Sequence, residues 1–84
     1  MSYSIAECES ITMDMIVTIG KSGNKYTVYL WHNTTHRGIN RIFDTIDKAF
    51  ELFALMSKYF VYGLYSINDR FEIFESWGGN ANET

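Results

Sequence analysis

The segment from Asp44 to Phe60 restricts the possible folds more than any other part of the chain, because it predicts a helix with a very wide apolar stripe. Asp44 is the predicted N-cap, and Asp47 adds a negative charge in the first turn, where the helix dipole favours one. The apolar residues recur at three- and four-residue steps: Ile46, Ala49, Phe50, Phe53, Met56 and Phe60, with Leu52, Leu55 and Tyr59 widening the stripe. A stripe of this width needs a broad apolar surface to cover it, and a β-sheet provides one.

Two segments before the predicted helix supply strands for such a sheet. From Ile11 to Ile19 (ITMDMIVTI), every second residue is apolar, which is typical of a half-buried strand. From Lys25 to His32 (KYTVYLWH), both faces of the predicted strand carry apolar or aromatic side chains. The five residues 20–24 between these segments contain two glycines and predict a hairpin connection.

Two further segments after the helix have the composition of strands. Val61–Ile67 and Arg70–Trp77 flank Asn68-Asp69, and both of these residue types tolerate the positive φ of a tight hairpin turn. The predicted order is therefore strand, strand, helix, strand, strand (ββαββ). This order predicts an α+β fold in which an antiparallel sheet of about four strands carries one helix packed on one face.

The chain is short enough to predict a single domain, residues 1–84. Its aromatic content of 17% allows a small core to bury a large apolar area. Residues 11–77 are the predicted ordered core, and residues 78–84 are predicted to form a flexible tail, because they contain only glycine, alanine and polar side chains. The sequence leaves the order of residues 1–10 open.

A single cysteine, Cys8, rules out an internal disulfide and favours a reducing compartment, so we expect a cytoplasmic protein. No charged segment followed by an apolar run opens the chain, and no run of about 18 apolar residues predicts a membrane span. Without a secretory signal, the Asn-x-Thr triplets that begin at Asn33 and Asn82 are interpreted as chance matches.

The residues that could carry chemistry do not predict a catalytic or metal site. His32 and His36 are one ligand short of the minimum for zinc, and Cys8 lies far from them in the sequence. Glu7 and Glu9 flank Cys8, and their negative charges disfavour the reactive thiolate. We therefore predict a non-enzymatic protein that uses no metal and no cofactor.

The predicted sheet has one helix for two faces, so its second face meets either solvent or a partner. Tyr29, Trp31, Tyr62 and Phe74 are candidates for that face, and exposed tyrosine and tryptophan concentrate at binding surfaces. We predict that these side chains bind a protein partner. Three alternatives stay open: tails cover the aromatics, a homodimer buries them, or a one-residue shift in register exchanges the two faces.

The stretch WHNTTHRGINR, residues 31–41, is interpreted as a long connection from the second strand to the helix. Arg37 and Arg41 at its far end would extend the aromatic face into a basic rim, and arginine is a common interface anchor. Both arginines therefore join the predicted partner-binding residues. The alternative is a plain solvated loop.

The predicted order of strands and helix rests on five segments between Ile11 and Ser76: ITMDMIVTI, KYTVYLWH, FDTIDKAFELFALMSKYF, VYGLYSI and RFEIFES. In this layout the chain resembles the small, acidic, single-domain inhibitors that phages make against bacterial defence nucleases, the anti-CRISPR class among them. The resemblance carries over no functional residue. It implies a protein without catalytic chemistry that blocks a host nuclease complex by occupying one of its surfaces.

The charge balance bears on how such a protein would act. The net charge of −3 disfavours nucleic acid as a partner, because phosphate binding depends on clustered lysine and arginine. Ten acidic against seven basic residues is also too balanced for a mimic of DNA, so we favour occlusion of a protein surface. The alternative functions are a structural homodimer or adaptor module, and a sheet that stacks single-stranded RNA on its aromatics.

Overall fold

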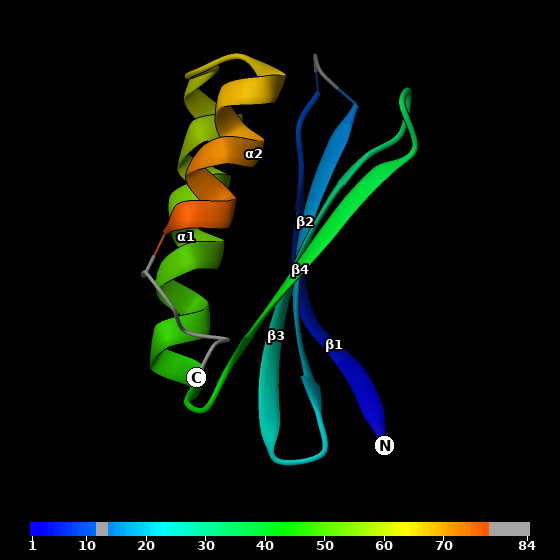
Figure 1. Ribbon diagram of the computed structural model, residues 1–84, viewed down its shortest axis with the longest axis vertical. Coiled ribbons are helices and arrows are strands. Elements are labelled where there is room, and N and C mark those ends of the chain that lie inside the picture. Colours follow the sequence, from blue (N-terminus) through cyan, green and yellow to red (C-terminus); the bar gives the residue numbers. More distant parts are fainter. Residues whose placement is uncertain (12–13, 78–84) are drawn as a thin grey trace.

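The computed structural model describes residues 1–11 and 14–77 of the protein. The elements follow in chain order as β1 (Ser2–Glu9), β2 (Met15–Ser22), β3 (Lys25–His32), β4 (Arg37–Phe43), α1 (Ile46–Tyr62) and α2 (Ile67–Ser76). The strands form one antiparallel sheet in the order β1-β2-β3-β4, and both helices lie on the same side of it (Figure 1). The predicted α+β class, with a four-stranded antiparallel sheet and a helix packed on one face, is confirmed. The predicted ββαββ order is wrong.

The N-terminal segment, whose order the sequence left open, forms the first strand. β1 pairs with β2, and the register shifts at a bulge between Ser4 and Ala6. Ala6 and Cys8 pack against the core beneath the helices. The predicted flexible tail, residues 78–84, lies outside the described residues.

The hairpin predicted between the first two apolar segments is confirmed as β2 and β3. Its turn consists of Gly23 and Asn24 alone, which makes it shorter than the predicted five-residue loop. Gly23 has a φ of 63°, a left-handed conformation that glycine adopts without steric cost. β2 begins at Met15, whereas Ile11, the predicted start of the strand, lies in the turn after β1.

The segment interpreted as a loop between the second strand and the helix contains the fourth strand. Residues 33–36 form a turn, with His36 at a φ of 56°, and β4 then pairs with β3. Ile39, Arg41 and Phe43 occupy the β4 positions that face the helices, so a charged residue lies between two apolar residues on this face of the strand. An arginine in a buried strand position interrupts the alternation that would have indicated a strand.

The predicted helix is confirmed as α1, although its limits and its cap differ from the prediction. The N-cap is Thr45, whose side-chain oxygen accepts a hydrogen bond from the backbone N–H of Lys48 (3.4 Å). The predicted N-cap, Asp44, instead forms an ion pair with Lys25. Gly63 ends the helix with a φ of 64°, and its N–H contacts the last carbonyls of α1.

The second predicted hairpin is wrong, because its residues form the end of α1 and the whole of α2. The hydroxyl of Ser66 accepts a hydrogen bond from the backbone N–H of Asp69 (3.1 Å), which caps α2. Phe71 and Phe74 are fully buried and lie three positions apart, on one side of a helix. The phenylalanines and the isoleucine of this short segment fit the residue spacing of a strand as well as that of a helix. The serine at its start was the signal that favoured a helix.

The core lies between the sheet and the helices, and α1 contacts all of the strands while α2 packs beside α1 (Figure 1). Its apolar residues are Met15, Val17, Ile19, Val28, Leu30, Phe43, Ala49, Leu52, Phe53, Met56, Phe60, Phe71 and Phe74. The strand members alternate along β2 and β3, so the opposite side chains of these strands point away from the helices.

A buried arginine joins the two helices. Arg70 of α2 is fully buried, and its Nε donates to the Leu64 carbonyl (2.8 Å) while its Nη2 donates to the Tyr59 carbonyl (3.2 Å). The last turn of α1 has no basic residue of its own, so Arg70 brings a positive charge to the carbonyl end of that helix. Burial lowers the pKa of Arg70 from its ordinary value, and the carbonyl oxygens compensate part of the lost hydration.

Candidate partner-binding face

Both helices lie on one side of the sheet, and the opposite face of the sheet is the candidate binding surface (Figure 1). We call it the outer face. Strand pairing assigns to it Ser2, Ser4, Glu7 and Glu9 of β1, Ile16, Thr18, Gly20 and Ser22 of β2, Lys25, Thr27, Tyr29 and Trp31 of β3, and Gly38, Asn40 and Ile42 of β4.

Tyr29 and Trp31 occupy the middle of the outer face. They lie two residues apart on β3, so their side chains emerge on the same side of the strand. Their ring centroids are 6.3 Å apart and the ring planes differ by 16°, which is an offset stacked arrangement. Tyr29 is 38% exposed and Trp31 is half-buried, so the pair forms an accessible and mutually supported aromatic platform.

Gly38 of β4 provides the space that these rings occupy. It pairs with Trp31 across the strands, and a Cβ atom at Gly38 would lie 2.7 Å from Cε3 of Trp31 and 2.8 Å from Cζ of Tyr29. Any other residue would displace the rings, because such distances are shorter than van der Waals contact. Gly38 was not among the residues predicted from the sequence, although a glycine inside a strand is a known signal of close approach by a neighbour.

A shallow hollow lies beside Tyr29 on the outer face, with a volume of about 420 Å³. Most of its lining residues have polar side chains: Ser2, Ser4, Ser22, Thr18, Thr27, Asn40 and Lys21, with Tyr3, Gly20 and Tyr29 completing the wall. Hydroxyl and amide groups around an aromatic platform supply the hydrogen bonds that surround the anchors of a typical protein interface.

The outer face carries uncompensated negative charge. Glu7 and Glu9 point outward from β1 and are exposed, and Asp14 lies exposed at the start of β2. None of them takes part in either ion pair found within the described residues. The lysine assigned to this face, Lys25, lies at its far end and is paired with Asp44. The aromatic platform is therefore bordered by acidic groups.

The predicted basic rim is wrong, because Arg37 and Arg41 occupy the β4 positions that face the helices. Arg37 lies 4.0 Å from the ring centroid of Phe71, and its Nη2 is 3.5 Å from Oε2 of Glu75. Arg41 is buried, and its Nη1 donates to the carbonyls of Phe74 (2.8 Å) and Glu75 (2.7 Å). Both arginines hold the carboxyl end of α2 against the sheet.

The remaining predicted site residues also lie away from the outer face. Phe74 is fully buried in the core, so its predicted position on an exposed sheet face is wrong. Tyr62 is 70% exposed, but it belongs to the end of α1, where it lines a separate hollow with Ile11 and Val61. Of the predicted partner-binding residues, Tyr29 and Trp31 meet on the outer face, whereas Arg41 and Phe74 meet on the helical side of the sheet.

The two histidines of the opening motif have separate surroundings. His32 is buried, and its Nδ1 lies 2.8 Å from the hydroxyl of Thr35, whereas His36 is exposed with its ring 5.9 Å from that of Trp31. Within residues 1–11 and 14–77, no three His, Cys, Asp or Glu side chains are grouped as a metal ion would need. No helix in the same ranges is both long and apolar enough to cross a membrane.

Comparison of the chain with protein-family models, with curated proteins and with solved structures found no match. The function is therefore argued from the chemistry of the outer face.

Proposed function

We propose that this chain is a small non-enzymatic protein-binding domain that acts as an inhibitor, using its outer face to occlude a surface of a bacterial defence nuclease complex in the cytoplasm. The observation that carries the proposal is the stacked pair of Tyr29 and Trp31 above Gly38. Tyrosine and tryptophan are the commonest anchors of protein interfaces, and rings that are already fixed by stacking lose little conformational entropy on binding. The pair is preorganised for contact with a flat partner surface.

The charge of the outer face indicates the kind of surface it would cover. Glu7, Glu9 and Asp14 carry negative charge that no described lysine or arginine neutralises. The surfaces with which nucleases hold phosphates are rich in lysine and arginine. An acidic face with aromatic anchors complements such a surface, and complementary charge speeds association and fixes orientation.

The same charge argues against the other proposed functions. An RNA strand stacked on Tyr29 and Trp31 would bring its phosphates towards Glu7 and Glu9, which repel them. A homodimer formed through two outer faces would bring two acidic borders together, because the lysines at this face, Lys21 and Lys25, lie at the opposite end from Glu9 and Asp14. Occlusion of a basic protein surface avoids both penalties.

The experiment is a DNA-cleavage assay with purified RNA-guided nuclease complexes, with and without the protein. The wild type is compared with the double variant Tyr29→Ala plus Trp31→Ala and with Tyr62→Ala, which removes an exposed aromatic outside the outer face. We expect the wild type and Tyr62→Ala to inhibit cleavage and the double variant to lose inhibition, with circular dichroism confirming that all are folded. Cleavage unaffected by the wild type in every complex would refute the inhibitor function.

A further inference from the structure

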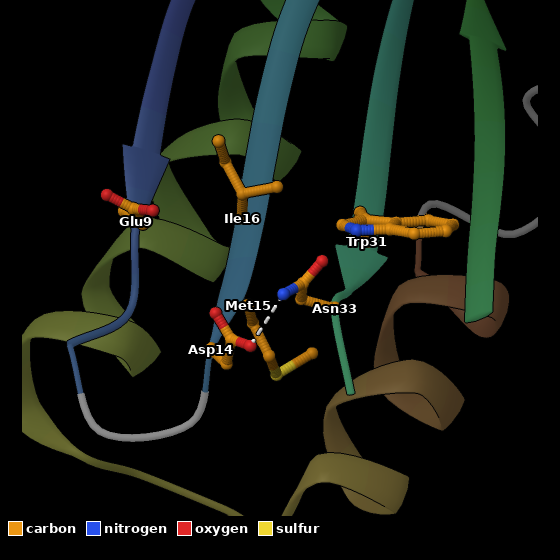
Figure 2. Close-up of a pocket in the computed structure, with 6 residues that line it drawn as sticks. All are labelled: Glu9, Asp14, Met15, Ile16, Trp31 and Asn33. Atoms are coloured by element: carbon orange, nitrogen blue, oxygen red, sulfur yellow. Dashed lines mark hydrogen bonds between the residues drawn. The ribbon is translucent and has the colours of Figure 1, made fainter. Parts of the chain in front are cut away.

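A pocket at one end of the outer face points to the chemistry of the partner. It has a volume of about 230 Å³ and is lined by Glu9, Asp14, Met15, Ile16, Trp31 and Asn33 (Figure 2). We call it the acidic pocket. We propose that the acidic pocket receives a cationic side chain of the partner protein, an arginine, between the indole of Trp31 and the carboxylates of Glu9 and Asp14. This inference rests on the proposed function, because it identifies what the partner presents to the outer face.

Strand pairing sets the dimensions of the acidic pocket. Glu9 pairs with Ile16 and Ile16 pairs with Trp31, so the three residues form one row across β1, β2 and β3. Neighbouring strands lie about 4.8 Å apart, which places the backbones of Glu9 and Trp31 roughly 10 Å from each other. Ile16 lies between them with its apolar side chain as the floor (Figure 2). The spacing leaves room for a flat group above the isoleucine.

Asp14 holds the second carboxylate at the open end of the acidic pocket. It has a φ of 53°, a left-handed conformation that is uncommon outside glycine but tolerated by aspartate and asparagine. Asn33 makes two hydrogen bonds to Asp14: the Asn33 Nδ2 donates to Asp14 Oδ2 (2.9 Å), and the Asn33 backbone N–H donates to the Asp14 carbonyl (3.0 Å). The amide neutralises no charge, and the other carboxylate oxygen is left to accept from a ligand (Figure 2).

The wall chemistry selects an organic cation. Two carboxylates without a paired lysine or arginine among the described residues favour a positive ligand. Within the described chain they have no third His, Cys, Asp or Glu neighbour that would complete a metal site. Trp31 adds an aromatic ring, and any cation gains from lying over the face of an indole, but only a flat cation can also stack on it. A guanidinium satisfies both requirements, because it is planar and presents donors that match carboxylates.

The proposal is tested on the isolated protein with N-acetyl-arginine amide as the probe and N-acetyl-citrulline amide as the matched neutral control. Citrulline replaces the guanidinium by an uncharged urea of the same shape. The readout is the NMR chemical shift of the Trp31 indole N–H, with the Trp77 indole, which packs against Phe43 in the core region, as an internal reference. We expect the arginine probe to shift Trp31 in a saturable, salt-sensitive way, while citrulline leaves it unchanged.

Two conservative variants locate the binding. Glu9→Gln and Asp14→Asn should each weaken binding of the arginine probe about twofold to fivefold, the range of a single exposed ion pair. Asparagine tolerates the left-handed backbone at position 14, so Asp14→Asn should keep the fold. Glu7→Gln is the control, because Glu7 is also outward-facing on β1 but does not line the acidic pocket. Equal shifts with citrulline, or equal weakening by Glu7→Gln, would overturn the inference.

The same variants separate this inference from the proposed function when they are tested against the inhibited nuclease complex. Loss of affinity with Glu9→Gln and Asp14→Asn, as well as with Tyr29→Ala plus Trp31→Ala, supports both. If the aromatic double variant loses binding while the two charge variants keep wild-type affinity, the acidic pocket is empty in the complex and only the inference fails. Binding of the arginine probe by a protein that inhibits no nuclease supports the acidic pocket and refutes the proposed function.

Discussion

Replacing Phe74 by alanine tests the arrangement of the C-terminal part of the chain. Phe74 is 0% exposed in α2, whereas an alternating strand over residues 70–77 would have turned it towards solvent. Removing a fully buried phenylalanine costs about 3–5 kcal/mol of unfolding free energy. A domain of this length has a total stability of only about 4–13 kcal/mol, so the loss is a large fraction of it. The corresponding decrease in Tm is at least about 12 °C.

Phe50→Ala provides the matched control, because Phe50 lies on α1 but is 53% exposed. Its truncation should cost no more than about 1 kcal/mol, since half of the ring already meets water. Guanidinium denaturation followed by circular dichroism measures both losses, and equal slopes show that the midpoints can be compared. A Phe74→Ala protein as stable as the wild type, or a larger loss with Phe50→Ala, would refute the packing of α2 described above.

Three further predictions concern separate parts of the molecule. Gly38→Ala should lower the unfolding free energy by about 1–3 kcal/mol, move the Trp31 indole signal and weaken the proposed inhibition, because the added methyl displaces the stacked rings; an unchanged NMR spectrum would contradict this. Arg70→Ala should cost about 1–3 kcal/mol for each carbonyl left without its donor, while Arg37→Ala, at an exposed ion pair, should cost less than about 1 kcal/mol in the same denaturation assay. Burial, and secondarily a neighbouring tyrosine, raises the pKa of Tyr59 above its ordinary value of 10.0. The folded state therefore holds this proton more tightly than the unfolded state, and stability should fall as the pH rises above about 10. Tyr59→Phe should reduce that fall, and an identical pH dependence in the variant would refute the assignment.

The sequence was sufficient where hydrophobic periodicity was undisturbed. The apolar stripe of α1 and the alternation of β2 and β3 predicted these elements, and the glycine-containing turn between the strands predicted their pairing. The alternation of side chains along β3 also placed Tyr29 and Trp31 together on one face, opposite Val28 and Leu30 of the core. In these segments a single physical pattern decided both the element and the direction of its side chains.

The sequence was insufficient where buried positions hold charged or short side chains. Arg37 and Arg41 point towards the helices from β4, so their strand did not show apolar alternation and its residues were assigned to a loop. Ala6 and Cys8 are small, which left β1 without a clear apolar face. Their outward neighbours Glu7 and Glu9 alternate with them, and this pattern of small and acidic residues was the available signal for the acidic border.

The errors in the candidate site follow from those in the fold. Phe74 was assigned to the exposed face because α2 was taken as a strand, and Arg41 because β4 was taken as a loop. Both are buried, and Arg41 contacts the carbonyl of Phe74 directly, which no local pattern in the sequence indicates. Such contacts depend on how α2 folds back over the sheet, and that is a property of the tertiary structure.

The most direct test of the outer face as the binding surface is an equilibrium affinity measurement with the nuclease complex that the protein is proposed to inhibit. Two double variants remove the same number of accessible aromatics: Tyr29→Ala plus Trp31→Ala on the outer face, and Phe50→Ala plus Tyr62→Ala on the helices. Loss of even one anchor costs at least about 2 kcal/mol, so the first variant should bind about thirtyfold more weakly or worse. The second should keep the wild-type affinity within about twofold, as expected away from the interface. Unchanged affinity in the first variant together with a large loss in the second would contradict the account and place the binding surface on the helical side.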